Sequence, residues 1–416
     1  MSATKPFVIP KLLVFEAWKA VKANAGSAGV DKETIDDFES ELKNNLYRIW
    51  NRMSSGTYFP TPVKAVAIPK KNGGERILGI PTVADRVAQM VVKMVLEPAV
   101  EPIFLPDSYG YRPAKSALDA VDTTRRRCWQ YDWILEFDIK GLFDNIDHAL
   151  LLRALDKHTD CKWVKLYIRR WLTAPLQRAD GTLVERTKGT PQGGVVSPVL
   201  ANLFMHYVFD VWMTRTFPGV PWCRYADDGL VHCKTEAEAH AIKAALQSRL
   251  AVCGLEMHPE KTHIAYCKDA NRKGKYPITK FDFLGYTFRG RKARHRNSST
   301  LFVSFSPAVS AKALKSMRER TRKRNFRNQT ELSLQDISRL HNPVLRGWVA
   351  YYGRFTPSAL SPMFRHFNKT LVAWAMRKFK RFKGHKTQAS MFLARIAETQ
   401  SGLFVHWQRG VKGAFA

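Results

Sequence analysis

The stretch CRYADDGLVHC, residues 223 to 233, places two adjacent carboxylates, Asp227 and Asp228, between two short runs rich in strand-forming residues. Side by side, the two charges repel each other and disfavour strand structure, so they mark a break between the runs. The pattern predicts a tight hairpin that carries both carboxylates at its turn. Taken alone, such a pair indicates a solvated turn, because aspartate is a common turn residue.

The chain carries a large excess of positive charge. Its 67 lysines and arginines against 36 aspartates and glutamates give a formal net charge of +31 and a pI near 10.0. Such a charge indicates a polyanionic partner, either nucleic acid or an anionic membrane surface. No apolar run approaches the roughly 18 residues that span a bilayer, and the first residues lack a signal-peptide pattern. We therefore expect a nucleic-acid partner, no membrane association, and an intracellular location in the cytoplasm of a bacterium.

Length and cysteine usage set further bounds. The 416 residues are 45% hydrophobic, which suffices for a buried core and for two or three domains. The six cysteines are scattered without a C-x-x-C pair, which argues against a disulfide framework and against a zinc module. We expect buried free thiols instead, including Cys223 and Cys233 on either side of the hairpin.

Positive charge is concentrated toward the C-terminus. Residues 289–327 hold thirteen lysines and arginines against one acid, and residues 363–386 hold eight against none. A Gly-, Ser- and Arg-rich stretch at 290–306 precedes a series of helical patterns. We therefore predict a domain boundary there, with an α/β body over 1–305 and a basic helical domain over 306–416.

Apolar spacing predicts mixed helices and strands in the body and almost only helices after residue 306. The predicted helices cover residues 12–24, 34–50, 82–97, 116–130, 146–157, 162–173, 198–215, 235–252, 308–325, 333–353, 359–381 and 387–398. The predicted strands cover residues 63–69, 76–80, 133–138, 222–226, 229–233, 262–267 and 283–288.

A third carboxylate indicates a chemical role for the hairpin. The segment WILEFDIKGLFDNID, residues 133–147, is an apolar strand that ends at Asp138. A strand end beside a tight hairpin can bring three carboxylates together, and such a cluster needs divalent cations to offset its charge. Two Mg²⁺ ions about 3.5 to 4 Å apart can activate an attacking hydroxyl and stabilise a leaving pyrophosphate.

An ordered series of motifs surrounds these carboxylates. In chain order they are AIPKKNGGERILGIPTVADR (67–86), SYGYRPAKSALDAV (108–121), ILEFDIKGLFDNID (134–147), GTPQGGVVSPVLANLF (189–204), CRYADDGLVHC (223–233), GLEMHPEKT (254–262), FDFLGYTF (281–288) and LHNPVLRGWVAYYGRF (340–355). This series, over about residues 10–410, resembles the reverse transcriptases encoded by group II introns, with the last motif similar to their maturase or thumb region.

The resemblance implies a fold, an activity and a set of partners. It implies a right-hand polymerase with α/β fingers and palm over residues 1–305 and an all-α thumb or maturase (X) domain over residues 306–416. It also implies RNA-directed DNA synthesis from dNTPs on an RNA template with a DNA primer, together with binding of the group II intron RNA to assist splicing and mobility. Asp138, Asp227 and Asp228 become the catalytic residues and the ligands of two Mg²⁺ ions.

The motif PKKNGGER indicates a hairpin with an Asn-Gly turn. Lys70 and Arg76 on its facing strands can clamp the triphosphate of an incoming nucleotide. In TPQGGVV, the glycines Gly193 and Gly194 allow close backbone approach, a helix follows near Ser197, and Gln192 is placed to contact the nascent pair or the template. The alternative is a bare connection from strand to helix.

Several motif residues have two open interpretations. Phe143 either lies under the sugar and rejects a ribose 2′-hydroxyl, or packs in the core. Lys261 in HPEKT either donates a proton to pyrophosphate or is a surface lysine. Arg112 either positions the template or braces the active site. For Asp144 and Asp147 we favour a helix N-cap role for one of the two.

The basic C-terminal helices interleave cations with aromatic residues. The aromatic residues partly form a core, and the cations either are solvated or neutralise phosphates of a primer–template duplex and of folded RNA. The predicted nucleic-acid contacts are Arg320, Arg322, Lys323, Arg324, Lys378, Lys380 and Arg381, with Arg112 in the body.

Two alternative functions share most of these features. The domain could serve another bacterial element, such as a retron, a diversity-generating element or a CRISPR-associated system. It could also be an RNA-binding splicing cofactor with an idle polymerase site. The intact motifs argue against this second alternative. Because the chain ends at Ala416 without paired C-x-x-C motifs, we expect no C-terminal endonuclease domain. The sequence indicates no oligomeric state.

Overall fold

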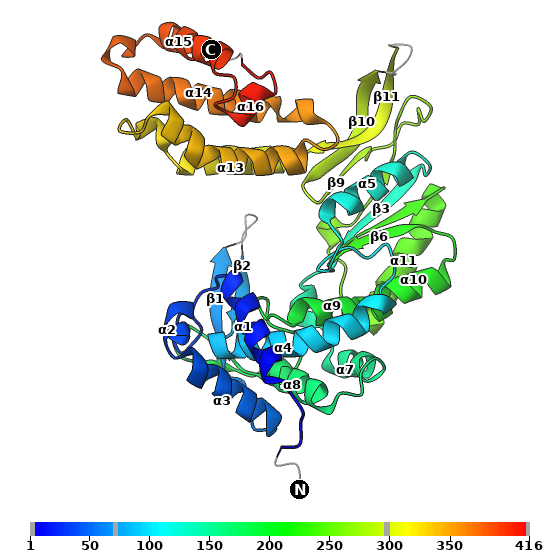
Figure 1. The fold of residues 1–416 in the computed structure, drawn as a ribbon. Coiled ribbons are helices and arrows are strands. Elements are labelled where there is room, and N and C mark those ends of the chain that lie inside the picture. The colour runs from blue at the N-terminus through cyan, green and yellow to red at the C-terminus, as the bar shows by residue number, and fades with distance from the viewer. Residues whose placement is uncertain (1–4, 70–73, 295–299, 413–416) are drawn as a thin grey trace. The chain divides into compact units, whose positions relative to one another are not determined.

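The computed structural model describes residues 5–69, 74–294 and 300–412 of the chain (Figure 1). The chain divides into two compact units. Unit 1 comprises residues 1–120 and 135–263, and unit 2 comprises residues 121–134 and 264–416. Each unit is described by itself below. The predicted nucleotide-clamping Lys70 lies outside the described residues.

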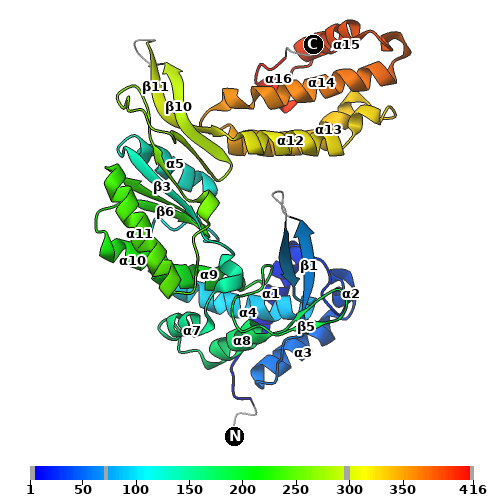
Figure 2. The same ribbon diagram turned by 180° about the vertical axis from the view of Figure 1, so that it is seen from behind.

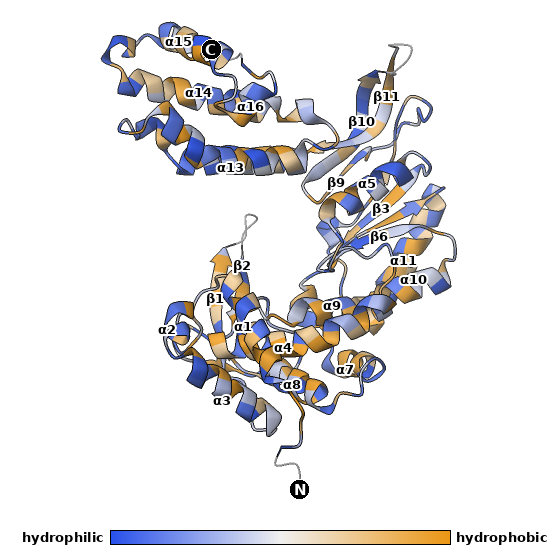
Figure 3. Cartoon of the chain, in the orientation of Figure 1, coloured by the Kyte–Doolittle hydropathy of each residue, from blue (hydrophilic) through white to orange (hydrophobic). Residues whose placement is uncertain are grey.

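Unit 1 begins with a helical layer. Helix α1 (Lys11–Ala23) matches its prediction closely, but the predicted helix over 34–50 is two helices, α2 (Ile35–Ser40) and α3 (Leu42–Ser54). The break lies at Glu41, whose backbone leaves the helical region. The long helix α4 (Val83–Val100) is buried along most of its length and packs against α1 and α3, and Figure 3 shows its many apolar residues.

The first sheet of unit 1 carries the predicted basic hairpin. Its strand order is β2-β1-β4-β5, and β1 (Val63–Pro69) pairs antiparallel with β2 (Glu75–Ile80) so that Ile68 lies opposite Arg76. Strands β4 (Leu176–Gln177) and β5 (Leu183–Val184) were not predicted, because two-residue strands leave no periodic signal.

A second four-stranded sheet, of order β6-β7-β3-β8, carries the predicted carboxylates. It comprises β3 (Trp133–Asp138), β6 (Trp222–Tyr225), β7 (Asp228–Cys233) and β8 (His263–Tyr266). The strand ending at Asp138 and the hairpin on either side of Asp227 are confirmed. In contrast to the sequence analysis, Asp228 is the first residue of β7 and pairs with Tyr225 across the turn.

Helices surround this sheet and its connections. The predicted helix over 198–215 is interrupted by a π-helical turn, η2 (His206–Asp210), between α9 (Ser197–Met205) and α10 (Val211–Thr216). The predicted helix start near Ser197 is confirmed. The remaining elements are η1 (Glu101–Ile103), α5 (Ala117–Cys128), α6 (Leu142–Asn145), α7 (His148–Asp156), α8 (Lys162–Thr173), α11 (Glu236–Val252) and η3 (Pro259–Lys261).

Unit 2 contains a three-stranded antiparallel sheet of order β11-β10-β9. Its strands are β9 (Lys280–Phe283), β10 (Tyr286–Arg294) and β11 (Leu301–Val309). The predicted strand over 283–288 is interrupted, because Leu284 and Gly285 take left-handed φ angles of 49° and 79° and turn the chain between β9 and β10. Strands β10 and β11 also occupy most of the stretch 290–306, where we had placed a boundary.

After β11, all the regular elements among the described residues are helices (Figure 2). A predicted helix over 308–325 instead begins at Ala311, because β11 continues to Val309 and Ser310 caps the helix. The elements are α12 (Ala311–Lys323), η4 (Phe326–Asn328), α13 (Leu334–Tyr352), η5 (Pro357–Leu360), α14 (Ser361–Lys378), η6 (Lys380–Phe382), α15 (Lys386–Thr399) and α16 (Val405–Gln408).

An aromatic core holds these helices together. Phe326, Phe367 and Phe404 are buried in one apolar cluster with Trp374 and Trp407. Large aromatic side chains contribute most of the burial energy of such a core, so the aromatic residues between the cations of this region are largely structural. The predicted domain boundary at residue 305 falls inside β11, and the assignment of a functional domain to residues 306–416 stays a prediction.

Two expectations about the whole chain can be compared with the structure. All six cysteines are free, and five of them, including Cys223 and Cys233, are buried, as expected. Within residues 5–69, 74–294 and 300–412, no helix combines the length and the apolar character that crossing a membrane requires.

Candidate active site

The hairpin between β6 and β7 is held in a tight environment. Ala226, before the carboxylates, takes a left-handed φ of 59°, and Gly229, after them, faces the buried ring of Phe137. A Cβ atom on Gly229 would lie 2.1 Å from that ring, so only glycine fits here. The ring of Phe137 on β3 therefore fixes the separation between the hairpin and the strand that ends at Asp138.

A fully buried arginine stabilises the hairpin through hydrogen bonds. Arg224 on β6 is 0% exposed, and its Nε and Nη2 atoms each donate a 2.7 Å hydrogen bond to the carboxylate of Asp210. Its other donors reach Asn202 Oδ1 at 3.2 Å, the Ala226 carbonyl at 3.1 Å and Ser108 Oγ at 2.8 Å. A buried charge is tolerated when it is paired and hydrogen-bonded in this way.

Sequence analysis missed Arg224. A signal was available, since an arginine inside an otherwise apolar strand needs a buried partner if it is not exposed. The partner, Asp210, lies in the π-helical turn 14 residues earlier, and the sequence pattern gave no indication of that turn.

The end of β3 meets the hairpin through backbone hydrogen bonds. The Ile139 amide donates to the Asp227 carbonyl at 3.3 Å, and the His258 amide donates to the Asp138 carbonyl at 2.8 Å. The second bond brings the segment HPEKT to the strand end. As a result, the Lys261 ammonium lies 2.6 Å from Asp138 Oδ2, although the lysine side chain is 53% exposed.

The electrostatics couple the carboxylates. Burial raises the pKa of Asp227, and the charge of Asp138 raises this pKa further, whereas Lys261 and Arg76 lower it. Asp138 therefore lies close enough to Asp227 for its charge to affect the ionisation of Asp227. Among the described residues no group of three or more His, Cys, Asp or Glu side chains is arranged to hold a metal ion. Two carboxylates nevertheless suit Mg²⁺, which often binds one or two carboxylates and takes its other oxygens from water and substrate phosphates.

A chain of polar contacts links the basic hairpin to the loop GTPQGG. Gln192 Nε2 donates to Asp144 Oδ2 at 2.9 Å, and Gln192 Oε1 accepts a hydrogen bond from Arg76 Nε. The loop is fixed on β2, because the Gly79 amide donates to the Gln192 carbonyl at 2.9 Å. Gly193 has a φ of 130°, and its Cβ position lies only 2.5 Å from the Gly79 carbonyl oxygen.

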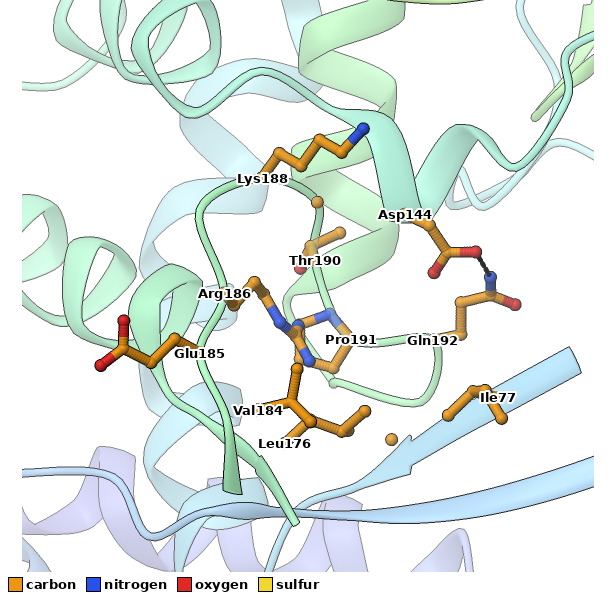
Figure 4. Close-up of a pocket in the computed structure, with 12 residues that line it drawn as sticks. Ile77, Asp144, Leu176, Val184, Glu185, Arg186, Lys188, Thr190, Pro191 and Gln192 are labelled. Atoms are coloured by element: carbon orange, nitrogen blue, oxygen red, sulfur yellow. Dashed lines mark hydrogen bonds between the residues drawn. The ribbon is translucent and has the colours of Figure 1, made fainter. Parts of the chain in front are cut away.

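This loop forms one wall of a small pocket of about 160 Å³ (Figure 4). The pocket lies between β2 and the segment 184–192, and Gln192 and Asp144 meet at its edge. Arg186 extends across it toward Pro191, and Lys188 donates to Asn145 Oδ1 at 2.8 Å. Two cationic side chains, Arg186 and Lys188, thus line the same pocket as Gln192 and Asp144.

Phe143 lies in α6, directly after the strand end. Its ring is 9% exposed and meets the ring of Tyr111 edge to face at 6.1 Å. Tyr111 takes a left-handed φ of 57°, and its pKa is raised by burial and by the nearby charge of Asp227. Sequence analysis did not single out Tyr111. The structure brings both rings to the carboxylates, and the role of Phe143 in sugar selection stays a prediction.

Arg112 and the two aspartates after Phe143 have structural contacts. The side chain of Arg112 is 7% exposed, pairs with Glu101 at 2.6 Å and donates to the carbonyls of Leu105 and Ser108. These contacts favour the bracing interpretation of Arg112 over template contact. Asp147 accepts from the Leu150 amide at 2.8 Å and caps α7, as predicted for one of the pair, while Asp144 holds Gln192.

The predicted nucleic-acid contacts in unit 2 divide into two groups. Arg324 donates to the Leu340 carbonyl at 3.0 Å, Lys378 donates to the Thr330 and Leu332 carbonyls, and Arg381 stacks 4.7 Å over the Phe382 ring. These three side chains stabilise the helical fold. The others, Arg320, Arg322, Lys323 and Lys380, are exposed, as Arg324 and Arg381 also are, so exposure alone does not separate the two groups.

Two carboxylates at a strand end, beside a basic hairpin, are residue types that metal-assisted phosphoryl transfer can use. The chain matches two family profiles: Reverse transcriptase (RNA-dependent DNA polymerase) over residues 68–288, and Group II intron, maturase-specific domain, over residues 314–390. The chain therefore belongs to the reverse transcriptase family, in the group encoded by group II introns.

Individual relatives agree with this assignment. The chain is 37% identical to Group II intron-encoded protein LtrA of Lactococcus lactis subsp. cremoris over 199 residues. The aligned segment covers 47% of this chain and 32% of LtrA. It is 29% identical over 311 residues to Protein YkfC of Escherichia coli (strain K12), covering 65% of this chain and 78% of that protein. An uncharacterized 91 kDa protein in the cob intron of Schizosaccharomyces pombe is 34% identical over 213 residues, which is 49% of this chain and 25% of that protein. The match thus spans about a third of LtrA's length.

Proposed function

We propose that the protein is a Mg²⁺-dependent RNA-directed DNA polymerase that also binds a group II intron RNA to assist its splicing and mobility. The observation that carries the polymerase half is the coupled pair Asp138 and Asp227, with Lys261 2.6 Å from Asp138. The maturase half rests on the match of residues 314–390 to the maturase-specific domain and on the high positive charge of that region.

Asp138, Asp227 and Asp228 would hold the metal ions. Asp138 and Asp227 supply two carboxylates, and Asp228 follows at the start of β7. Bound Mg²⁺ would activate the primer 3′-hydroxyl and stabilise the departing pyrophosphate. The hairpin supports this role because Arg224, Phe137 and the Ile139 amide fix its position, so little rearrangement is required for the carboxylates to act.

The surrounding side chains would bind and orient the nucleotide. Arg76, together with Lys70, would contact the triphosphate, and Gln192 would lie against the nascent base pair. The hydrogen bonds of Gln192 to Arg76 and Asp144 fix the amide orientation, with Oε1 toward the arginine. Lys261 would stabilise the carboxylates before substrate binding and donate a proton to pyrophosphate afterwards.

Residues 1–305 would supply the fingers and palm of the polymerase, and residues 306–416 would supply its thumb and maturase domain. The exposed cations Arg320, Arg322, Lys323 and Lys380 would contact RNA phosphates. Partners are then the intron RNA, an RNA template with a DNA primer, and dNTPs.

Primer extension by the purified protein on an RNA template tests the polymerase assignment, with Asp227→Asn as the inactive comparison. Synthesis that depends on Asp227 and on Mg²⁺ supports the proposal, whereas its absence in the parent protein would favour a splicing cofactor with an idle site. Recovery of a structured RNA encoded around the gene with the purified protein would support the intron assignment over a retron or CRISPR-associated host.

A further inference from the structure

A hollow in unit 2 lies apart from the candidate active site. It is formed by the end of α12, the turn η4 and one face of α14, and its volume is about 190 Å³. A water molecule occupies about 30 Å³ in the liquid, so the hollow has room for roughly six waters or for one larger polar group. Its lining includes Arg322, Asn325, Arg327, His366, Lys369 and Thr370, and it contains no acid.

Positive charge converges on this hollow from three separate segments. Arg322 comes from α12, Arg327 from η4 and Lys369 from α14, and all three residues are exposed. Within the part of the chain that the structure describes, none of the three is in an ion pair. Like charges brought together in this way destabilise a fold unless an anion lies between them.

The neutral groups of the hollow are arranged as donors. Asn325 Oδ1 already accepts a hydrogen bond from Asn328 Nδ2 at 3.0 Å, so the side chain of Asn325 offers its amide hydrogens. Thr370 is an exception, because it already donates its one hydroxyl hydrogen to the His366 carbonyl at 2.9 Å. The Nε2 atom of His366 is buried and has no hydrogen-bond partner among the described residues, a condition that natural proteins seldom leave uncompensated.

Charge also bears on His366 directly. Burial lowers the pKa of its imidazole, and Arg322, Arg318 and Lys369 lower it further. A negatively charged ligand would offset both effects, because it would pair with the cations and accept a hydrogen bond from the ring. The lining thus suits an anion with several acceptor oxygens.

We propose that this hollow is a binding site for one phosphate group of structured RNA. A phosphodiester supplies the acceptor oxygens that arginine forks, an amide and an imidazole can share. The choice of RNA as the source rests on the proposed function, since the lining residues lie within the maturase-specific match of residues 314–390. The hollow itself is argued only from its lining.

The opposite face of α12 supplies a contrast. Arg324, one turn after Arg320, donates to the Leu340 carbonyl at 3.0 Å, and both arginines border a much smaller gap of about 10 Å³ beside Trp348 and Phe367. That gap cannot hold a phosphate. Arg324, at the end of α12, is therefore bonded to α13, whereas Arg322 lines the hollow on the other side of the helix.

Three variants test the site by RNA binding over a range of salt concentrations. Each of Arg327→Gln and Lys369→Gln should weaken binding by about tenfold, as expected for one charge-assisted contact. The double variant should lower the slope of log affinity against log salt by about one unit and no more, because all the cations share one phosphate. The matched control, Lys386→Gln with Arg395→Gln on α15, removes the same charge from exposed positions and should change the slope by less than half as much.

Inorganic phosphate gives a test that does not use RNA. At equal ionic strength, phosphate should raise the melting temperature of the parent protein above its value in chloride, and should do so less in the double variant. In chloride the double variant should be as stable as the parent or more so, since like charges have been removed, which separates loss of binding from loss of folding.

Each other result overturns the proposal. Equal salt slopes in the parent and the double variant, or an equal loss in the α15 control, would make the lining a solvated surface. Stabilisation by phosphate without any change in salt slope would assign the hollow to a free ion rather than to RNA. Failure of the parent to bind any RNA would instead contradict the proposed function, while the phosphate measurement would still decide whether the hollow binds an anion.

Discussion

The Lys261 ammonium lies 2.6 Å from a carboxylate oxygen of Asp138, at the point where β3 ends beside the hairpin of β6 and β7. The Asp138 side chain is 11% exposed, and its charge also raises the pKa of Asp227. Lys261 therefore offsets part of the repulsion between two carboxylates that lie close together. A divalent cation bound by these carboxylates would take over that role and release the amine toward the substrate.

The first prediction concerns this lysine. Lys261→Ala should slow primer extension by about a hundredfold or more if the amine donates a proton. Lys261→Arg keeps a cation beside Asp138 but cannot release a proton, so it should restore the stability of the site without restoring the rate. Both variants are compared with the parent by single-turnover nucleotide addition at saturating Mg²⁺. Full activity in Lys261→Arg would exclude proton donation and leave only charge compensation.

A second prediction separates chemistry from folding at the hairpin. Asp227→Asn should abolish detectable DNA synthesis while RNA binding persists. Burial raises the folded-state pKa of Asp227 above its ordinary value of 3.8, so its ionisation opposes folding, and this cost grows as pH rises through that range. The variant should therefore melt at the same temperature as the parent or higher at pH 7. Asp36→Asn, an exposed change on α2, is the control for charge, and retained synthesis in Asp227→Asn would disprove the catalytic assignment.

The third prediction concerns the buried ion pair of Arg224 and Asp210. Arg224→Met leaves Asp210 charged and unpaired in the interior, and should lower the free energy of unfolding by about 3 to 5 kcal/mol. The double variant Arg224→Met with Asp210→Leu removes both charges and should recover most of that loss. Denaturant unfolding of the parent and of each variant measures the coupling. Additive losses in the double variant would mean that the two side chains do not stabilise each other.

How much of this site could be predicted from the sequence depends on how far apart along the chain the contacting residues lie. The hairpin at Asp227 and the strand end at Asp138 were predicted because strand runs and turn residues are local signals. Arg224, Tyr111 and the Asp144–Gln192 contact were not, because their partners lie as far as 116 residues away in the chain and no local period marks them. The turn at Leu284 was missed because a leucine rarely takes a left-handed φ.

The same limit explains the basic helices. Composition predicted a cationic, aromatic-rich region, but it could not show which cations face the helical core. Lys378 donates to two backbone carbonyls, whereas Lys380, two residues later, is exposed. The distinction depends on where η4 and α13 pack against α14, which is a tertiary property.

A fourth prediction tests sugar selection at Phe143. Phe143→Val should raise the incorporation of ribonucleotides relative to deoxynucleotides, because it removes a ring next to Tyr111 beside the carboxylates. Competition between the two nucleotide types on one template measures the ratio. Phe204→Leu, a change in a buried ring on α9, controls for general loosening of the core. If the ratio stays constant in Phe143→Val, the ring packs in the core and does not select the sugar.

The last prediction separates the two basic faces of α12. Arg324→Gln should lower the melting temperature and leave the salt dependence of RNA binding nearly unchanged, because its guanidinium is used by the Leu340 carbonyl. Arg322→Gln with Lys323→Gln should keep the melting temperature and flatten the salt dependence by roughly one to two units, since both residues are exposed. Mg²⁺ is held constant in all measurements, because it competes for phosphates. If instead Arg324→Gln flattened the salt dependence as strongly as the other pair, the contact with Leu340 would have to yield to RNA, and α12 would present a single continuous RNA-binding face.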